Sequence, residues 1–320
     1  MTTNLSMSRR QMLAVGVSGV AVVGLSKSSG AESAAKAVGR SPAPFRFCLN
    51  TGTLLGHKLK LEQEIEIAAK AGYEAVELWI EKINAFTQGG GSLQDMRKKI
   101  ADVGLTVEDA ISFPRWCVDD DAQRAQGLEQ MKRDMATVAE IGARRIAAPP
   151  SGVSSQPGLD LRKAAERYRA VLELGDQAGV PAVLEIWGAS KNLSRLSEAA
   201  FVALESGHPK ASILADVFHI YRSGASFDGL KLLSNRMIQV FHMNDYPADP
   251  PRDQIKDRDR IFPGDGVAPL SQILRNLADI GGGQVLSLEL FNPNYAKQDA
   301  LVVAKTGLEK MKAAVAKTFD

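Results

Sequence analysis

The sequence PAVLEIW, residues 181–187, is a short apolar run that ends in an acidic residue, Glu185. The same pattern recurs at Asp216 in SILADVFH, His242 in IQVFHMND and Glu289 in VLSLELFN. Each run has the length and composition of a buried β-strand, and each polar residue stands where a strand gives way to a loop. If the four strands are neighbours in one barrel, these four side chains converge at one end of it.

Short apolar runs alternate with helical stretches from about residue 45 onward. Strand character is found at residues 45–49, 75–80, 105–111, 145–148, 181–186, 212–217, 238–243 and 285–290. Helices are expected at residues 62–71, 93–103, 122–141, 161–178, 196–205, 270–280 and 300–316. This order is typical of βαβ units around a parallel sheet.

The fold class follows from this alternation and from the punctuation between the elements. Gly72, Gly104, Gly142 and Gly179 each close an expected helix, as C-terminal glycines do. The first strand lacks a following Gly-x-Gly-x-x-Gly motif, which disfavours a dinucleotide-binding open sheet. Because (β/α)8 barrels of ~250 residues are single domains, we expect an α/β fold with one TIM barrel over residues 44–320. Its active site should lie at the C-terminal ends of the strands.

The front of the chain has the layout of an export signal. Arg9 and Arg10 precede an apolar stretch at residues 14–25, and small residues up to Ala31 fit a cleavage site. The apolar stretch has about 12 residues, short of the ~20 that span a bilayer, so no stable membrane anchor is expected. The pattern resembles bacterial twin-arginine signals. We expect residues 1–31 to engage the twin-arginine export machinery, residues 32–43 to be a disordered spacer, and the mature protein to be periplasmic.

Composition and charge exclude some classes of function. A net charge of +2 is not the footprint of a nucleic-acid-binding protein. Two cysteines, Cys48 and Cys117, do not make a disulfide framework and are expected to be free and buried. The oligomeric state stays open, a homo-oligomer included.

The four strand-end residues suit a metal ion. Two Glu, one Asp and one His are the ligands that a hard or borderline divalent cation prefers, whereas softer metals would want sulfur. Clustered buried carboxylates also need a cation between them. The sequence predicts one divalent ion (Mn, Mg, Co or Zn) on Glu185, Asp216, His242 and Glu289. The alternative is four unrelated polar residues at strand ends, where polar residues are common.

Short motifs around these residues resemble those of the xylose isomerase-like barrels, in particular the sugar phosphate isomerase/epimerase group with its inosose isomerases and ketose 3-epimerases. They are Leu-Glu at 184–185, Asp-x-x-His at 216–219, His-x-x-Asp at 242–245, Arg-x-x-Pro-Gly-x-Gly at 260–266 and Leu-Glu-Leu at 288–290. The resemblance covers roughly residues 45–316. It implies that Glu185, Asp216, His242 and Glu289 hold one divalent metal.

The resemblance also implies the reaction. Glu185 and Glu289 would exchange protons with the carbon next to a sugar carbonyl, through an enediolate that the metal stabilises. Return of the proton to the opposite face gives an epimer, and its return to the neighbouring carbon gives the aldose or ketose isomer. The substrate is then a small carbohydrate. His219 and Arg260 match residues that contact substrate in the family.

Further site residues are expected from their positions alone. Asp245 is expected to orient His242 as a hydrogen-bond acceptor. Glu77, inside the expected second strand, is expected to contact substrate and to point to the same side as Trp79. Trp116 and Trp187 are expected to offer flat surfaces to a sugar ring, with core packing as the alternative. Residues 244–266 are expected to form a substrate lid, since long loops in compact domains are usually functional.

Three other functions remain in view. A metal-dependent lyase or dehydratase acting on a keto-sugar or keto-glycoside would share the enediolate and then expel a β-substituent. An apurinic endonuclease-type phosphodiesterase would need more histidines than His57, His208, His219 and His242 supply, and nucleic acid is not an expected partner. A non-catalytic sugar-binding barrel would keep the fold without turnover.

Overall fold

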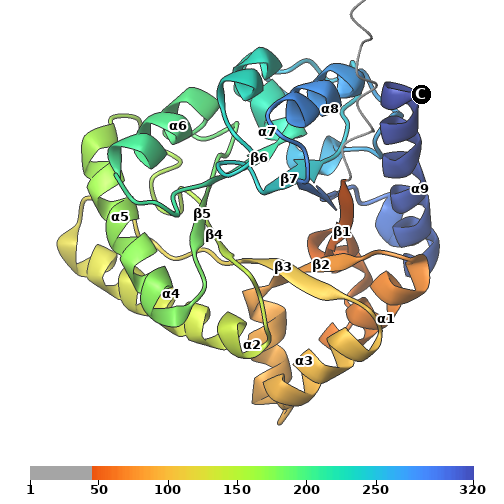
Figure 1. Ribbon diagram of the computed structural model, residues 1–320, viewed down its shortest axis with the longest axis horizontal. Coiled ribbons are helices and arrows are strands. Elements are labelled where there is room, and N and C mark those ends of the chain that lie inside the picture. Colours follow the sequence, from red (N-terminus) through yellow and green to blue (C-terminus); the bar gives the residue numbers. More distant parts are fainter. Residues whose placement is uncertain (1–44) are drawn as a thin grey trace, which may run out of the picture. The chain divides into compact units, whose positions relative to one another are not determined.

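The computed structural model describes residues 45–320, so the expected signal (1–31) and spacer (32–43) lie outside the described residues. Eight parallel strands form one sheet in the order β3-β2-β1-β8-β7-β6-β5-β4. The strands surround the centre and the helices form an outer ring (Figure 1). The architecture is a (β/α)8 TIM barrel, which confirms the predicted fold class.

Each expected strand is present, with ends that differ by up to two residues from the expected ones. The strands are β1 (Arg46–Asn50), β2 (Ala75–Trp79), β3 (Thr106–Ile111), β4 (Ile146–Ala148), β5 (Ala182–Glu185), β6 (Ile213–Asp216), β7 (Val240–Met243) and β8 (Val285–Leu288). β3 and β4 are the two ends of the sheet order. A backbone hydrogen bond of 3.1 Å from Arg144 N–H to the Val107 carbonyl connects them and nearly closes the barrel.

All seven expected helices are present. They are α1 (Leu61–Ala71), α3 (Leu93–Asp102), α4 (Asp121–Glu140), α5 (Leu161–Ala178), α6 (Leu196–Glu205), α8 (Leu270–Asp279) and α9 (Ala300–Phe319). Two further helices, α2 (Ile80–Gln88) and α7 (Val217–Arg222), each begin on the residue that follows a strand. Short 3-10 helices are η1 (Thr51–His57), η2 (Phe227–Leu232), η3 (Asp257–Asp259) and η4 (Tyr295–Lys297).

Helix ends follow the chemistry read from the sequence. The four helix-closing glycines all adopt positive φ, between 73° and 92°, a conformation that glycine adopts without a steric cost.

Within residues 45–320, no helix combines the length and the hydropathy needed to cross a bilayer.

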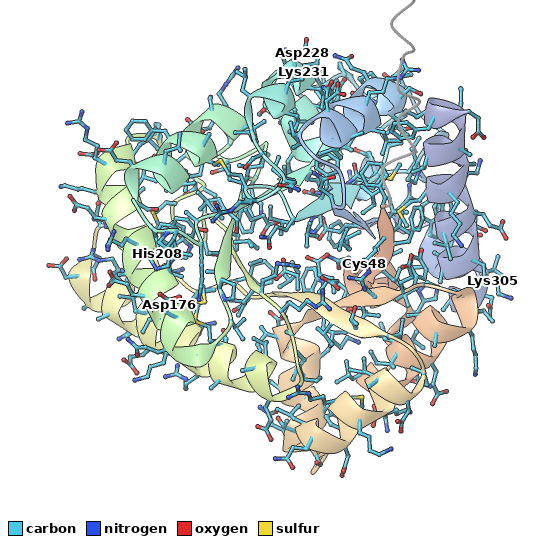
Figure 2. All side chains as sticks on the ribbon, viewed as in Figure 1. Cys48, Asp176, His208, Asp228, Lys231 and Lys305 are labelled. Atoms are coloured by element: carbon cyan, nitrogen blue, oxygen red, sulfur yellow. The ribbon has the colours of Figure 1, made fainter. Side chains whose placement is uncertain are left out.

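The barrel interior contains a layer of small and branched apolar side chains to which every strand contributes one residue. The layer consists of Cys48, Ala75, Ile111, Ala147, Val183, Leu214, Val240 and Val285. Residues that alternate with these point outward and pack against the helices in the larger core. Cys48 lies inside the barrel (Figure 2), and both it and Cys117 are free and buried, as predicted.

One buried carboxylate outside the barrel interior has an unusual environment. Glu64 of α1 is fully buried, and its carboxylate lies 3.1 Å from Lys82 Nζ of α2. Burial raises the pKa of Glu64 to about 7, because the Lys82 ammonium offsets only part of the cost of burying the charge.

Glu64 should therefore make folding stability depend on pH. Its pKa in the folded state exceeds the ordinary value of 4.5, so the folded protein holds this proton more tightly than the unfolded chain. The resulting stabilisation is fully present below pH 4.5 and is lost as the pH rises to and through 7, by about 3 kcal/mol in all. We expect the unfolding free energy of wild type to fall by this amount relative to E64Q over that range. Denaturant titrations measure it, and a pH-independent difference would contradict the assignment.

Candidate active site

A layer of polar side chains lies next to the apolar layer of the barrel interior, nearer the C-terminal ends of the strands, because strand side chains alternate in direction. Glu185, Asp216 and His242 each follow an inward apolar residue by two positions, at Val183, Leu214 and Val240. Side chains two residues apart on a strand share a face, so all three point into the barrel at its C-terminal end. Asp216 and His242 are also paired in register between β6 and β7.

Three of the four predicted metal ligands lie together. Ligand atoms of Asp216, His242 and Glu289 all lie within 4.8 Å of one another, and all three residues are buried. His242 Nδ1 lies 3.5 Å from Asp216 Oδ2 and 3.2 Å from Glu289 Oε2. Ligands at ~2.1 Å from one divalent ion are spaced by roughly 3.0–3.4 Å in octahedral or tetrahedral geometry, so the arrangement fits a metal.

Glu185 does not belong to this group of three. Its side chain reaches the same pocket, and its Oε2 is buried without a hydrogen-bond partner. Burial, and then the negative charge of Glu289, raise the pKa of Glu185 well above its ordinary value. Its role as a metal ligand stays a prediction.

The local sequence explains how Asp216 presents one oxygen to the site. Asp216 is the N-cap of α7, and its Oδ1 accepts a hydrogen bond of 2.9 Å from the backbone N–H of His219. Oδ2 is left for the barrel mouth, where Asn244 Nδ2 donates to it at 3.1 Å. The Asp-x-x-His motif therefore has two roles. Oδ1 of Asp216 caps the start of α7, and Oδ2 of the same residue remains available to the candidate site.

The far side of His242 contacts Glu77, not Asp245 as predicted. His242 Nε2 lies 2.9 and 3.0 Å from the two carboxylate oxygens of Glu77. Asp245 instead accepts hydrogen bonds from four backbone N–H groups, those of Tyr246, Gly264, Gly266 and Ala268, and so shapes its own loop. The prediction for Glu77 was also wrong in part: it points inward, but it is fully buried below the pocket and does not line it.

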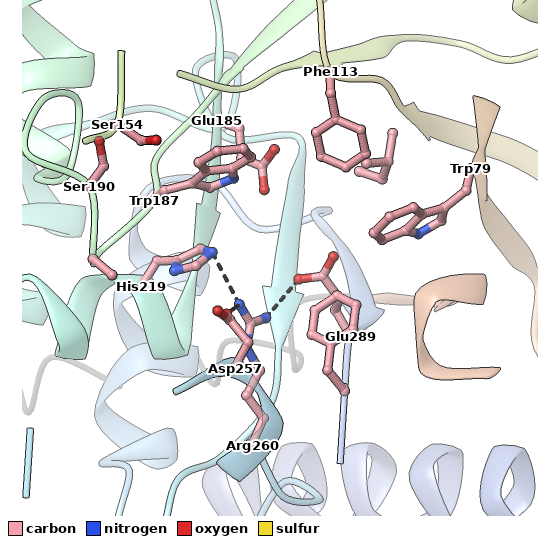
Figure 3. A pocket seen from close by; sticks show the side chains of 13 residues that line it. Trp79, Phe113, Ser154, Glu185, Trp187, Ser190, His219, Asp257, Arg260 and Glu289 are labelled. Atoms are coloured by element: carbon pink, nitrogen blue, oxygen red, sulfur yellow. Dashed lines mark hydrogen bonds and ion pairs between the residues drawn. The ribbon is translucent and has the colours of Figure 1, made fainter. Parts of the chain in front are cut away.

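Arg260 contributes the positive charge of the site. Its Nη1 donates to Asp216 Oδ2 at 2.9 Å and to Glu289 Oε2 at 2.7 Å. Its Nη2 donates to Asp257 Oδ1 at 2.5 Å and lies 3.1 Å from His219 Nε2 (Figure 3). The guanidinium also lies over the rings of Phe218 and Phe291, and the residue is almost completely buried.

These contacts set the charge state of the acidic groups. Burial alone would raise the pKa of Asp216, but the Arg260 guanidinium holds it far below its ordinary value. Burial likewise opposes ionisation of Glu289, and His242 and Arg260 nevertheless lower its pKa. Burial lowers the pKa of His219, which keeps that imidazole neutral. Asp216 and Glu289, the two carboxylates of the candidate metal group, are therefore ionised.

A cavity of about 360 Å³ opens above these residues. Trp79, Phe113, Trp187 and Phe291 line one part of it, and consecutive ring centroids along Phe291, Trp79, Phe113 and Trp187 are 6.1, 5.4 and 6.1 Å apart. Figure 3 shows Trp187, Phe113 and Trp79 on one side of the cavity and Arg260 on the other. The pocket thus has an aromatic wall and a charged wall.

Predictions for the other pocket residues had mixed outcomes. The structure places Trp187, His219 and Arg260 in the pocket lining. Trp116 is not there: it is fully buried, donates through Nε1 to the Pro149 carbonyl at 2.8 Å and packs against Tyr168. The packing alternative is the correct one for Trp116.

The expected lid, residues 244–266, is more ordered than a bare loop. It contains η3, and Asp245 and Ile261 form an antiparallel bridge. It brings Asp257 and Arg260 into the pocket lining. Its movement as a lid stays a prediction.

Sequence reasoning missed several contacts. Asn50 at the end of β1 donates through Nδ2 to Glu289 Oε1 at 3.0 Å and accepts from Trp79 Nε1 at 2.9 Å. The strand-end pattern that identified Asp216 applies to Asn50 as well and could have found it. Asp257 and Asn244 lie in loop sequence without a comparable signal.

Comparisons with known proteins agree with this geometry. The chain is 27% identical over 281 residues to an inosose isomerase of Bacillus velezensis, covering 86% of this chain and 98% of that protein. It is 24% identical to a 3-dehydroshikimate dehydratase of Pseudomonas aeruginosa, over 78% of this chain and 39% of that protein.

Among solved structures, the IolI protein with a bound zinc atom superposes with a TM-score of 0.80 at 23% identity, covering 86% of this chain and all of that one. A model of the xylose isomerase-like TIM barrel matches residues 65–314. The protein therefore belongs to the xylose isomerase-like TIM barrel family.

Proposed function

We propose that the protein is a divalent-metal-dependent isomerase or epimerase that moves a proton next to the carbonyl of a sugar. The observation that carries this proposal is the group of Asp216, His242 and Glu289, whose ligand atoms lie within 4.8 Å of one another beneath a pocket that Glu185 also lines. Similarity to an inosose isomerase over 98% of that protein's length supports the same class of reaction.

The chemistry divides between the cation and the chain. A divalent ion, when bound, polarises a carbonyl and an adjacent hydroxyl and so acidifies the carbon between them. Glu289 reaches the pocket as an ionised carboxylate held by Arg260 and Asn50. Glu185 reaches it with one oxygen free of hydrogen bonds. Two carboxylates of this kind can take up and return one proton.

The pocket favours an uncharged substrate. Among the described residues that line it, Arg260 is the one side chain with a permanent positive charge, and its guanidinium is paired with Asp216, Asp257 and Glu289. A phosphate or carboxylate on the substrate would compete for a donor that is already committed. The aromatic wall suits the apolar C–H face of a sugar ring. We therefore propose a non-phosphorylated keto-sugar as substrate class.

A solvent-exchange assay tests this function. Protein loaded with Mn²⁺ should wash deuterium from D2O into the carbon next to the carbonyl for at least one member of a panel of keto-sugars. Both E185Q and E289Q should slow this exchange by about 10²–10⁴-fold, the contribution typical of a positioned acid or base.

The matched control for the exchange assay is E173Q. Glu173 is half exposed and pairs with Arg169 on the outer helix α5, so its loss should leave exchange unchanged. Failure of the metal-loaded wild type to exchange any member of the panel would reject the proposed reaction. It would favour the non-catalytic sugar-binding alternative if the sugars still bind.

A lyase or dehydratase is the second candidate, supported by the similarity to a 3-dehydroshikimate dehydratase. It would share the proton abstraction and then expel a β-substituent. Product analysis separates the two: with a 3-keto-glycoside as substrate, an epimerase retains the leaving group in every product, whereas a lyase releases it. We expect retention, and stoichiometric release would reassign the reaction.

A phosphodiesterase of the apurinic endonuclease type fits the geometry poorly. His57 contacts the Gln298 carbonyl at 3.0 Å, and His208 contacts Asp176 at 3.1 Å among the outer helices (Figure 2). Only His219 and His242 are left for the site. The described residues therefore supply too few imidazoles there for a three-metal cluster.

We also propose that residues 1–31 direct export by the twin-arginine route. The motif Arg9-Arg10, followed by a short apolar stretch, supports this. Replacing both arginines by lysine (R9K with R10K) should leave the protein in the cytoplasmic fraction at its precursor length. Cell fractionation with wild type as reference measures it, and export of the double variant would refute the proposal.

A further inference from the structure

A fully buried carboxylate lies directly beneath the candidate metal group. Both oxygens of Glu77 on β2 face His242 Nε2, at 2.9 and 3.0 Å, and Ser287 Oγ on β8 donates to Glu77 Oε2 at 2.6 Å. Glu77 and His242 have no exposed surface. Residues of three strands, β2, β7 and β8, therefore converge on one polar contact inside the barrel.

Contact with substrate does not explain Glu77. It is absent from the pocket lining and lies on the side of the imidazole that faces away from Asp216 and Glu289. A carboxyl group in such a place is costly to bury unless hydrogen-bonding partners meet it. The partners of Glu77 are the Ser287 hydroxyl and the His242 imidazole. We therefore look for the role of Glu77 in its effect on His242.

The orientation of His242 follows from this contact. With Nε2–H directed at Glu77, the ring turns its other nitrogen, Nδ1, toward Asp216 Oδ2 at 3.5 Å and Glu289 Oε2 at 3.2 Å. Nδ1 is buried and has no hydrogen-bond partner. A histidine that binds a metal through one nitrogen commonly donates its other N–H to a carboxylate, which fixes the tautomer and increases the basicity of the ligand.

We propose that Glu77, held by Ser287, is a positioning residue that fixes His242 with Nδ1 free to bind a divalent cation. This inference rests on the proposed metal-dependent function. It assigns part of the metal affinity to a residue that touches neither metal nor substrate. Ser287 acts one step further out, by anchoring one oxygen of Glu77.

The test measures Mn²⁺ binding by loss of the sharp EPR signal of the free ion, in wild type, E77Q and S287A. E77Q keeps the shape and a hydrogen-bond acceptor but removes the charge, and it should raise the dissociation constant by roughly 10- to 100-fold. S287A keeps the charge and loses one hydrogen bond, so it should raise the constant by about fivefold. If E77Q does not fold, S287A alone decides, and unchanged affinity in S287A then rejects the proposal.

D134N is the matched control. Asp134 on α4 is also buried and accepts a short serine hydrogen bond, 2.5 Å from Ser112 Oγ, but it does not line the pocket. It should keep wild-type Mn²⁺ affinity whatever it does to stability. An E77Q constant within threefold of wild type, or an equal loss in D134N, would overturn the role of Glu77 while leaving the metal site standing. Wild type that binds no Mn²⁺ would overturn both.

Discussion

The placement of buried negative charge is the constraint on which the rest of the site depends. Glu77, Glu185, Asp216 and Glu289 converge inside one barrel mouth, where an unpaired carboxylate would cost several kcal/mol. Hydrogen bonds from Asn50, Asn244 and Ser287 and from the α7 backbone satisfy part of this demand. Arg260 satisfies more, but through one guanidinium. His242, which contacts Glu77, Asp216 and Glu289, is the other group that offsets this negative charge.

The fold was accessible from the sequence because its signals are local. Strand composition, helix periodicity and closing glycines identified all eight strands and seven helices. Helices α2 and α7 were missed for a shared physical reason: each starts directly after a strand, at Ile80 and at Val217, without a loop or a turn residue between. Apolar residues at those positions extend the strand pattern by one residue and hide the change in backbone conformation.

The sequence predicted the positions of site residues only where these residues lie on strands, whose side chains alternate in direction. Two-residue alternation places Asp216 and His242 inward without any knowledge of the loops. It also places Glu77 inward, but it cannot say that Glu77 lies below His242 and out of reach of the pocket. Trp116 and Asp245 lie in loops that follow strands. The position of Trp116 depends on its hydrogen bond to the Pro149 carbonyl, and that of Asp245 depends on its bridge to Ile261. No rule based on spacing along the chain reaches those contacts.

Shared charge contacts connect the candidate metal group to the loop after β7. Arg260 of that loop contacts the same oxygens, Asp216 Oδ2 and Glu289 Oε2, that lie nearest His242 Nδ1. The oxygens that would hold a divalent ion are thus also the partners of the guanidinium, which couples the candidate metal group to the position of Arg260. Burial, and then the negative charge of Glu289, raise the pKa of Glu185, so this carboxyl holds a proton more readily than an ordinary glutamate does. Glu185 therefore differs from Asp216 and Glu289, whose pKa values are lowered, and neighbouring carboxyl groups with pKa values shifted apart are what acid–base chemistry requires.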